Sequence, residues 1–117
     1  MSDGGREWRF YIDDMIAFAQ KVLVYTAGLD LNAFVANTLV YDATLRNLEL
    51  IGEAATRVPD DVRKVHPQVP WRMIIATRNR LIHAYLGIDN DTLWSIVVTD
   101  VPALLTTLRA VRLRESG

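Results

Sequence analysis

The residues best suited to chemistry lie within one stretch of nine, which reads TRNRLIHAY. This stretch carries two guanidinium groups, an amide, an imidazole and a phenol, on Arg78, Arg80, Asn79, His83 and Tyr85. An imidazole titrates near neutral pH and can move a proton to or from a ribose 2′-hydroxyl. A guanidinium stabilises the negative charge that builds on a phosphate during transfer. Together these groups fit metal-free ribonuclease chemistry.

In such a reaction His83 acts as general base or acid, Arg78 holds the scissile phosphate, and Asn79 orients His83 or the phosphate. The product carries a 2′,3′-cyclic phosphate end. On a helix Asn79 and His83 share a face, but Arg78 and His83 lie about 140° apart. A dimer axis beside this helix would bring two copies of these residues into one shared cleft. The same sequence also fits an ordinary helix with solvated arginines and a half-buried histidine.

Several other kinds of site are excluded or disfavoured by the composition. The chain has no cysteine, which rules out disulfides, cysteine-ligated zinc, iron–sulfur clusters and thiol catalysis. Its two histidines, His66 and His83, are too far apart in sequence to form a metal-ligand pair, and no glycine-rich phosphate loop is present. We therefore expect neither a metal nor a cofactor. His66 stands beside Pro67 in a connector, and we expect it at the surface.

The charge balance limits how the chain can bind nucleic acid. Thirteen Lys and Arg against fourteen Asp and Glu give a formal net charge of −1, so RNA binding must rest on a local patch. Arginine suits phosphate recognition, and only Lys21 and Lys64 are lysines. Arg72 and Arg80 add cations on the helix that carries His83, and we expect them to extend an RNA-binding patch.

A second segment offers a supporting carboxylate. Arg46, Glu49 and Glu53 follow three- and four-residue steps on a predicted helix, so Glu53 could face the same cleft and orient Arg78 or His83. Ordinary surface pairing, of Arg46 with Glu49 and of Glu49 or Glu53 with Arg57, explains the same spacing equally well. Gly52 is more readily explained by a close approach of two helices than by chemistry.

The pattern of apolar residues predicts an all-α fold. Apolar positions recur at three- and four-residue steps, and Gly, Asp, Asn and Pro mark the ends of the helices. Pro102 falls inside the last helix and predicts a kink or a brief break near Asp100 to Val101. The predicted helices cover residues 8–27, 31–35, 38–58, 59–66, 70–87 and 92–114.

These elements predict an antiparallel bundle of four main helices in one domain, residues 8–117, after a flexible leader, residues 1–7. The three tryptophans are expected in the core or at a homodimer contact. The N-terminus lacks the apolar core of a signal peptide, and no apolar run reaches the length of a membrane span. We therefore expect a cytoplasmic protein that does not enter the membrane.

The order Arg, four residues, His, one residue, Tyr resembles the signature of HEPN-domain proteins of the HepT type. Here it reads Arg78, residues 79–82, His83, Ala84, Tyr85, with a polar residue directly after the arginine. The resemblance covers roughly residues 11–108. It includes further segments in the family's order: Leu45-Arg46-Asn47-Leu48-Glu49, Ile51-Gly52-Glu53-Ala54, Val69-Pro70-Trp71, Leu93-Trp94-Ser95-Ile96 and Asp100-Val101-Pro102.

The resemblance implies a homodimeric bundle of four to five helices whose motif lines the dimer cleft. It implies a ribonuclease toxin of a type VII-like toxin–antitoxin system, acting on mRNA or tRNA without a metal and blocking growth. It also implies a cognate antitoxin, an MntA-like nucleotidyltransferase that transfers AMP from ATP onto Tyr85. The adduct would be bulky and anionic, and would occupy the place of the RNA phosphate beside Arg78 and His83.

Two alternatives stay open at this point. The chain could be a catalytically inactive HEPN dimer that serves as the binding subunit of a minimal nucleotidyltransferase, with the motif retained as a nucleotide or phosphate pocket. It could also be a bundle whose polar helix serves only dimer packing. Toxicity on expression, cleavage of purified RNA and transfer of AMP to Tyr85 separate these hypotheses.

Overall fold

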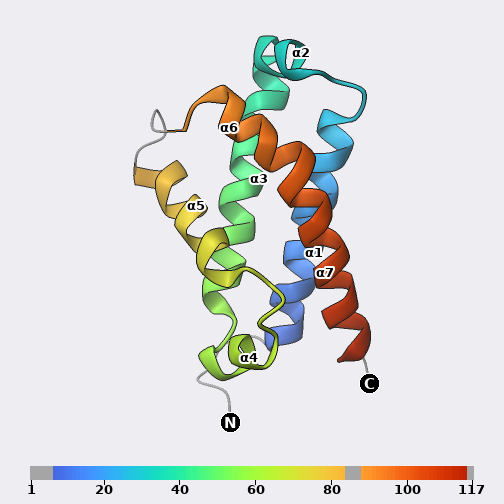
Figure 1. Ribbon diagram of the computed structural model, residues 1–117, viewed down its shortest axis with the longest axis vertical. Coiled ribbons are helices and arrows are strands. Elements are labelled where there is room, and N and C mark those ends of the chain that lie inside the picture. The colour runs from blue at the N-terminus through green and yellow to red at the C-terminus, as the bar shows by residue number, and fades with distance from the viewer. Residues whose placement is uncertain (1–6, 84–87, 116–117) are drawn as a thin grey trace.

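A bundle of helices makes up the computed structural model, which describes residues 7–83 and 88–115 and measures 47 × 28 × 22 Å (Figure 1). No strand occurs among these residues, which confirms the predicted all-α fold. The elements are α1 (Trp8–Thr26), α2 (Leu31–Ala36), α3 (Thr38–Arg57), α4 (Asp60–Val65), α5 (Trp71–His83), α6 (Asn90–Ser95), the π-helical turn η1 (Ile96–Asp100) and α7 (Val101–Arg114).

Short polar side chains define where the helices begin. Asp30 accepts a hydrogen bond from the Ala33 N–H at 2.8 Å and starts α2, and Asp89 accepts from the Thr92 N–H at 2.7 Å and starts α6. Each bond satisfies a backbone donor that the first turn of a helix leaves unpaired. Gly28, after the end of α1, has a φ of +77°, a conformation that glycine adopts without steric cost.

The predicted break before Pro102 is a π-helical turn. The Val101 N–H bonds to the Ile96 carbonyl, one residue further back than in an α-helix. A proline ring clashes with the carbonyl four residues earlier, here that of Val98, and the wider turn relieves that crowding. The turn lets α6, η1 and α7 continue as one bent segment along the bundle (Figure 1).

Four helical segments enclose the core. In Figure 1, α1 and α3 lie side by side, α7 covers α1, and α5 lies against α3 at the edge of the bundle. At the far end, Phe34 of α2 packs its ring 5.0 Å from that of Trp94, joining α2 to α6. The buried positions recur at helical spacing along each long helix, as the apolar pattern predicted; they include Ile12, Met15, Ala19, Val22, Leu48, Ile51, Ala55, Leu81, Leu93, Val97, Leu105, Leu108 and Val111.

His66 is buried, so its predicted surface position was wrong. The residue is 1% exposed, its ring lies 6.0 Å from that of Trp8, and its Nε2 lies 3.3 Å from Glu115 Oε2. The Trp71 indole N–H donates to the His66 carbonyl at 3.0 Å. The connector after α4 therefore packs against the start of α1 and the end of α7, contacts from distant parts of the chain that the neighbouring Pro67 does not reveal.

The leader predicted at residues 1–7 lies outside the described residues except for Glu7. This carboxylate accepts the Arg9 N–H at 3.1 Å and caps α1. The hydrogen bond and charge of Arg9 hold the pKa of Glu7 below its usual value. Among the helices of the described ranges, none combines the length and the apolar character needed to cross a bilayer.

Candidate functional site

Arg78 lies where α5 comes closest to α3. A Cβ added to Gly52 of α3 would lie 2.7 Å from Arg78 Cγ, closer still to Arg78 Cβ, and 3.3 Å from the Ile74 carbonyl oxygen. A real side chain at residue 52 would therefore push the two helices apart. The prediction that Gly52 allows a close helix approach is confirmed, and the residue it admits is the motif arginine.

The guanidinium of Arg78 is held on two sides. Its Nη2 donates to Glu53 Oε1 at 2.6 Å, and its Nη1 donates to Asn79 Oδ1 at 2.9 Å. The side chain is 25% exposed, and Nε is buried without a hydrogen-bond partner among the described residues. Two charge-assisted or polar contacts on one planar group fix its orientation. Arg78 is thus a positioned guanidinium and not a freely solvated one.

Glu53 pairs both with Arg57 on its own helix and with Arg78 on α5, the two interactions that its position in the sequence allowed. Its Oε2 accepts from Arg57 Nη2 at 3.1 Å while its Oε1 accepts from Arg78. The hydrogen bond from Arg57, followed by that from Arg78, lowers the pKa of the Glu53 carboxyl below its usual value. The lowered pKa favours the ionised carboxylate, which keeps Arg78 in place. Arg46 and Glu49 also pair, at 3.6 Å.

His83 ends the described part of α5 and is exposed, one turn beyond Asn79. The Asn79 side-chain oxygen is bonded to Arg78, whereas the sequence had left its partner as His83 or the phosphate. Arg78 faces α3, where Glu53 holds it, and His83 faces solvent on another side of α5. One copy of the chain therefore does not bring the guanidinium and the imidazole together.

The other predicted site residues lie on or beyond the same helix. Arg72 and Arg80 are both exposed on α5, and the positive charge of Arg80 contributes to lowering the pKa of Asp89, after the backbone and side-chain hydrogen bonds from Thr92. Tyr85, the residue that the resemblance implies is modified, lies outside the described residues. No three His, Asp or Glu side chains within residues 7–83 and 88–115 are grouped so that they could hold a metal ion.

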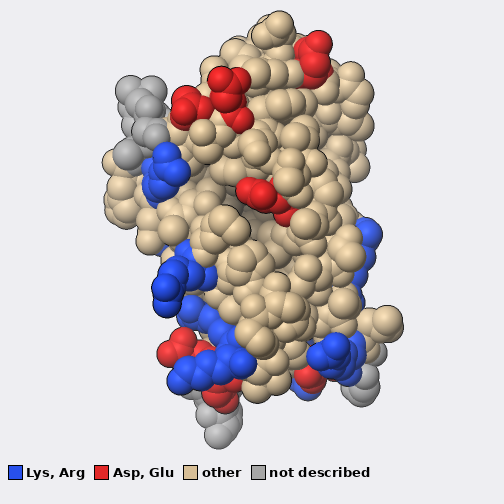
Figure 2. Space-filling view, in the orientation of Figure 1, with Lys and Arg blue, Asp and Glu red and all other residues tan. Residues whose placement is uncertain are grey.

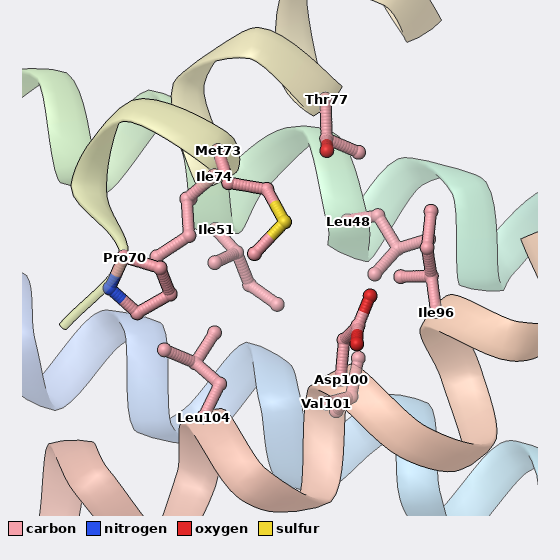
Figure 3. A pocket seen from close by; sticks show the side chains of 10 residues that line it. All are labelled: Leu48, Ile51, Pro70, Met73, Ile74, Thr77, Ile96, Asp100, Val101 and Leu104. Atoms are coloured by element: carbon pink, nitrogen blue, oxygen red, sulfur yellow. The ribbon is translucent and has the colours of Figure 1, made fainter.

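Beside α5 there is also a narrow apolar cleft, seen in Figure 3, that separates this helix from η1 and the start of α7. Thr77 and Asp100 are its polar side chains, and the Asp100 carboxylate points into it. Its volume is about 60 Å³, against roughly 300–1,000 Å³ for typical small-molecule sites. It has room for a few waters. Neither Arg78 nor His83 lines this cleft, so it is not the candidate active site.

Comparison with known proteins gives a consistent result. The model of the HepT-like family, described as "Ribonuclease HepT-like", matches residues 15–111, a range that contains every candidate site residue. "Putative RNase MJ1380" of Methanocaldococcus jannaschii is 39% identical over 99 residues, covering 85% of this chain and 91% of that protein. "Probable ribonuclease HepT" of Thermococcus cleftensis is 34% identical over 99 residues, covering 85% of this chain and 90% of that protein. No solved structure matches significantly.

Proposed function

The chain belongs to the HepT-like ribonuclease family, and from that premise we propose that it is the toxin of a toxin–antitoxin pair. In this proposal it is a homodimeric endoribonuclease that cleaves mRNA or tRNA without a metal ion. Its relatives carry ribonuclease names, which supports RNA as the substrate class. The observation that carries the proposal is on α5, where Glu53 and Asn79 hold the guanidinium of Arg78 and an exposed imidazole, His83, follows five residues later.

The proposed reaction needs one guanidinium and one imidazole. The ribose 2′-oxygen forms a bond to the adjacent phosphorus, and the bond from that phosphorus to the 5′-oxygen of the next nucleotide breaks. His83 accepts the 2′-hydroxyl proton, and the leaving 5′-oxygen takes up a proton from His83 or from water. Arg78 stabilises the added negative charge on the phosphoryl oxygens. The products are a 2′,3′-cyclic phosphate and a 5′-hydroxyl.

A homodimer is part of the proposal because one copy keeps the two groups apart. Arg78 is directed toward α3 by Glu53, and His83 points to solvent about 140° away around the helix. A two-fold axis beside the end of α5 would set Arg78 of one copy near His83 of the other. Ile82, next to His83, leaves 41% of its surface exposed and would be covered by such a contact.

The proposed inhibition by the antitoxin is a modification of Tyr85, which follows His83 by two residues. A nucleotidyltransferase partner would let the Tyr85 phenol oxygen attack the α-phosphorus of ATP, which releases pyrophosphate and the phenolic proton and leaves AMP on the tyrosine. The adduct adds a bulky negative group close to His83. It would compete with the RNA phosphate for Arg78, so activity should fall.

Cleavage of purified RNA in EDTA tests the proposed reaction. The wild-type protein should give fragments with 2′,3′-cyclic phosphate ends, and His83→Ala or Arg78→Ala should slow cleavage by about 10²-fold or more. Arg46→Ala, which removes an exposed cation from α3, is the matched control and should cleave normally. Loss of activity in EDTA would remove metal independence from the proposal.

The inactive-module alternative has its own outcome in these tests. If wild-type protein and His83→Ala are equally harmless on expression and neither cleaves RNA, the ribonuclease proposal fails and a binding subunit of the nucleotidyltransferase remains. Intact-mass measurement with the partner and ATP tests the regulation separately. It should show AMP on the wild-type chain and none on Tyr85→Phe, and an adduct unchanged by Tyr85→Phe would overturn the assignment of that residue.

A further inference from the structure

An open basic groove lies between α4 and the first half of α5, away from the motif residues themselves. It has a volume of about 720 Å³, and its charged side chains are Asp60, Arg63 and Lys64 of α4 and Arg72 of α5, set among apolar residues. Figure 2 shows Lys and Arg gathered along the edge of the molecule that α4 and α5 form, with acidic side chains beside them at the α4 end, while acidic side chains predominate toward the end occupied by α2 and α6. We call this feature the basic groove.

Two of the three cations in the basic groove are available to a ligand. Arg63 is already engaged, because its Nε donates to the Val58 carbonyl at 2.9 Å and its Nη1 lies 3.9 Å from Asp60. Lys64 and Arg72 are exposed, and neither has a carboxylate of the described residues within 4.0 Å. Unpaired cations that line one concave surface create a local positive potential, even in a chain whose net charge is −1.

The basic groove shares a helix face with the candidate catalytic imidazole. Arg72, Ala76, Asn79 and His83 follow one another at steps of four, three and four residues, so they form one stripe along α5. Arg72 and Ala76 line the groove, and His83 stands at the other end of the stripe. Along the helix axis His83 lies about 16 Å from Arg72, at a rise of 1.5 Å per residue. A chain bound at His83 and running along α5 would therefore enter the groove.

We propose that the basic groove binds the phosphate backbone of the RNA strand beyond the cleavage site. This inference rests on the proposed ribonuclease function. Lys64 and Arg72 contact phosphates, whereas the charge of Arg63 is offset by Asp60, which also lines the groove. Trp71 lines the groove but is only 8% exposed, so it offers no platform on which bases could stack. Recognition at this site is therefore electrostatic and independent of base sequence.

The test measures binding of a 2′-O-methylated oligouridine, which has no free 2′-hydroxyl and cannot be cleaved. Its dissociation constant is measured by fluorescence anisotropy over a range of salt concentrations, for the wild-type chain and for Lys64→Gln/Arg72→Gln. A plot of the logarithm of the binding constant against the logarithm of the salt concentration has a negative slope. Each cation that no longer neutralises a phosphate of a single strand should reduce the magnitude of this slope by about 0.7. The double variant should therefore show a magnitude reduced by about 1.4. Lys21→Gln/Arg109→Gln, which also removes one Lys and one Arg, is the matched control and should keep the wild-type slope.

Cleavage gives a second readout that separates this inference from the proposed function. The double variant should raise KM for a long RNA but leave cleavage of a dinucleotide unchanged, because a dinucleotide at His83 does not reach the groove. If no protein cleaves RNA but the salt slope still falls, the proposed function fails, and what stands is that the groove binds RNA phosphates. If cleavage depends on His83 but the salt slope and the KM of Lys64→Gln/Arg72→Gln equal those of the control variant, the groove assignment is wrong. Loss of binding to the nucleotidyltransferase with RNA binding intact would also overturn it.

Discussion

Replacing Gly52 with alanine should weaken the fold and displace Arg78 in one step. The new Cβ would lie 2.7 Å from Arg78 Cγ and closer still to Arg78 Cβ, which is bonded directly to the backbone and cannot rotate away. Helix α5 would have to move outward, and the 2.6 Å hydrogen bond from Arg78 to Glu53 would lengthen or break. The perturbation therefore reaches the proposed site through packing alone.

The sign of the stability change makes this prediction decisive. Crowding a packed contact costs about 1–3 kcal/mol, whereas alanine in place of glycine inside a helix gains about 0.5–1 kcal/mol. We expect a net loss of about 1–2 kcal/mol in the free energy of unfolding. RNA cleavage by the folded fraction should fall as well, because Arg78 no longer holds its orientation.

Urea unfolding followed by tryptophan fluorescence measures this loss, at a fixed protomer concentration because the stability of the proposed homodimer would depend on concentration. Ala17→Gly, on an exposed face of α1, measures the intrinsic difference between alanine and glycine in this protein and should cost about 0.5–1 kcal/mol. If Gly52→Ala is instead more stable than the wild type by that same amount, α5 does not press on residue 52 and the description of the site is wrong.

Three further changes test the hydrogen bonds that define the fold and the site. Arg57 and Arg78 lower the pKa of Glu53, so this carboxylate adds stability above its unfolded pKa of about 4.3, and that contribution is lost as pH falls through the lower folded pKa. In Glu53→Gln the urea midpoint should therefore fall less steeply as the pH is lowered into the acid range. A fall as steep as in the wild type would contradict the pairing of Glu53 with Arg57 and Arg78. Trp71→Phe removes the donor to the His66 carbonyl and should cost about 1 kcal/mol by urea unfolding without changing RNA cleavage. Asp30→Ala removes the cap of α2 and should also cost about 1 kcal/mol, and a loss below about 0.3 kcal/mol would show that the cap does not form in solution.

Local signals in the sequence predicted several helix starts to within two residues: the helix predicted from residue 92 begins at Asn90, while the predicted end of α5 at residue 87 lies outside the described residues. Asp30 and Asp89 bond to backbone donors only three residues away, so their roles can be read without knowledge of the fold. Pro102 likewise predicted the break before α7, because a proline ring restricts the backbone of the turn just before it. The π-helical form of that break required the structure.

Contacts between distant elements could not be predicted in the same way. His66 is buried by Trp8 and Glu115, which lie near the two ends of the chain. The spacing of Glu53 allowed partners on its own helix or on another, and the packing at Gly52 is what brings Arg78 within reach. Lys64 and Arg72 stand on different helices, and only the structure shows that both line the basic groove.

The central claim is that Arg78 and His83 act together across a dimer interface, and a mixed dimer tests it most directly. A heterodimer of Arg78→Ala and His83→Ala chains, purified with two different tags, would hold one site with both groups intact and one with neither. If the site is shared, this heterodimer should cleave RNA at about half the rate of the wild-type dimer, while each homodimeric variant stays inactive. A heterodimer as inactive as the two variants would contradict the shared site.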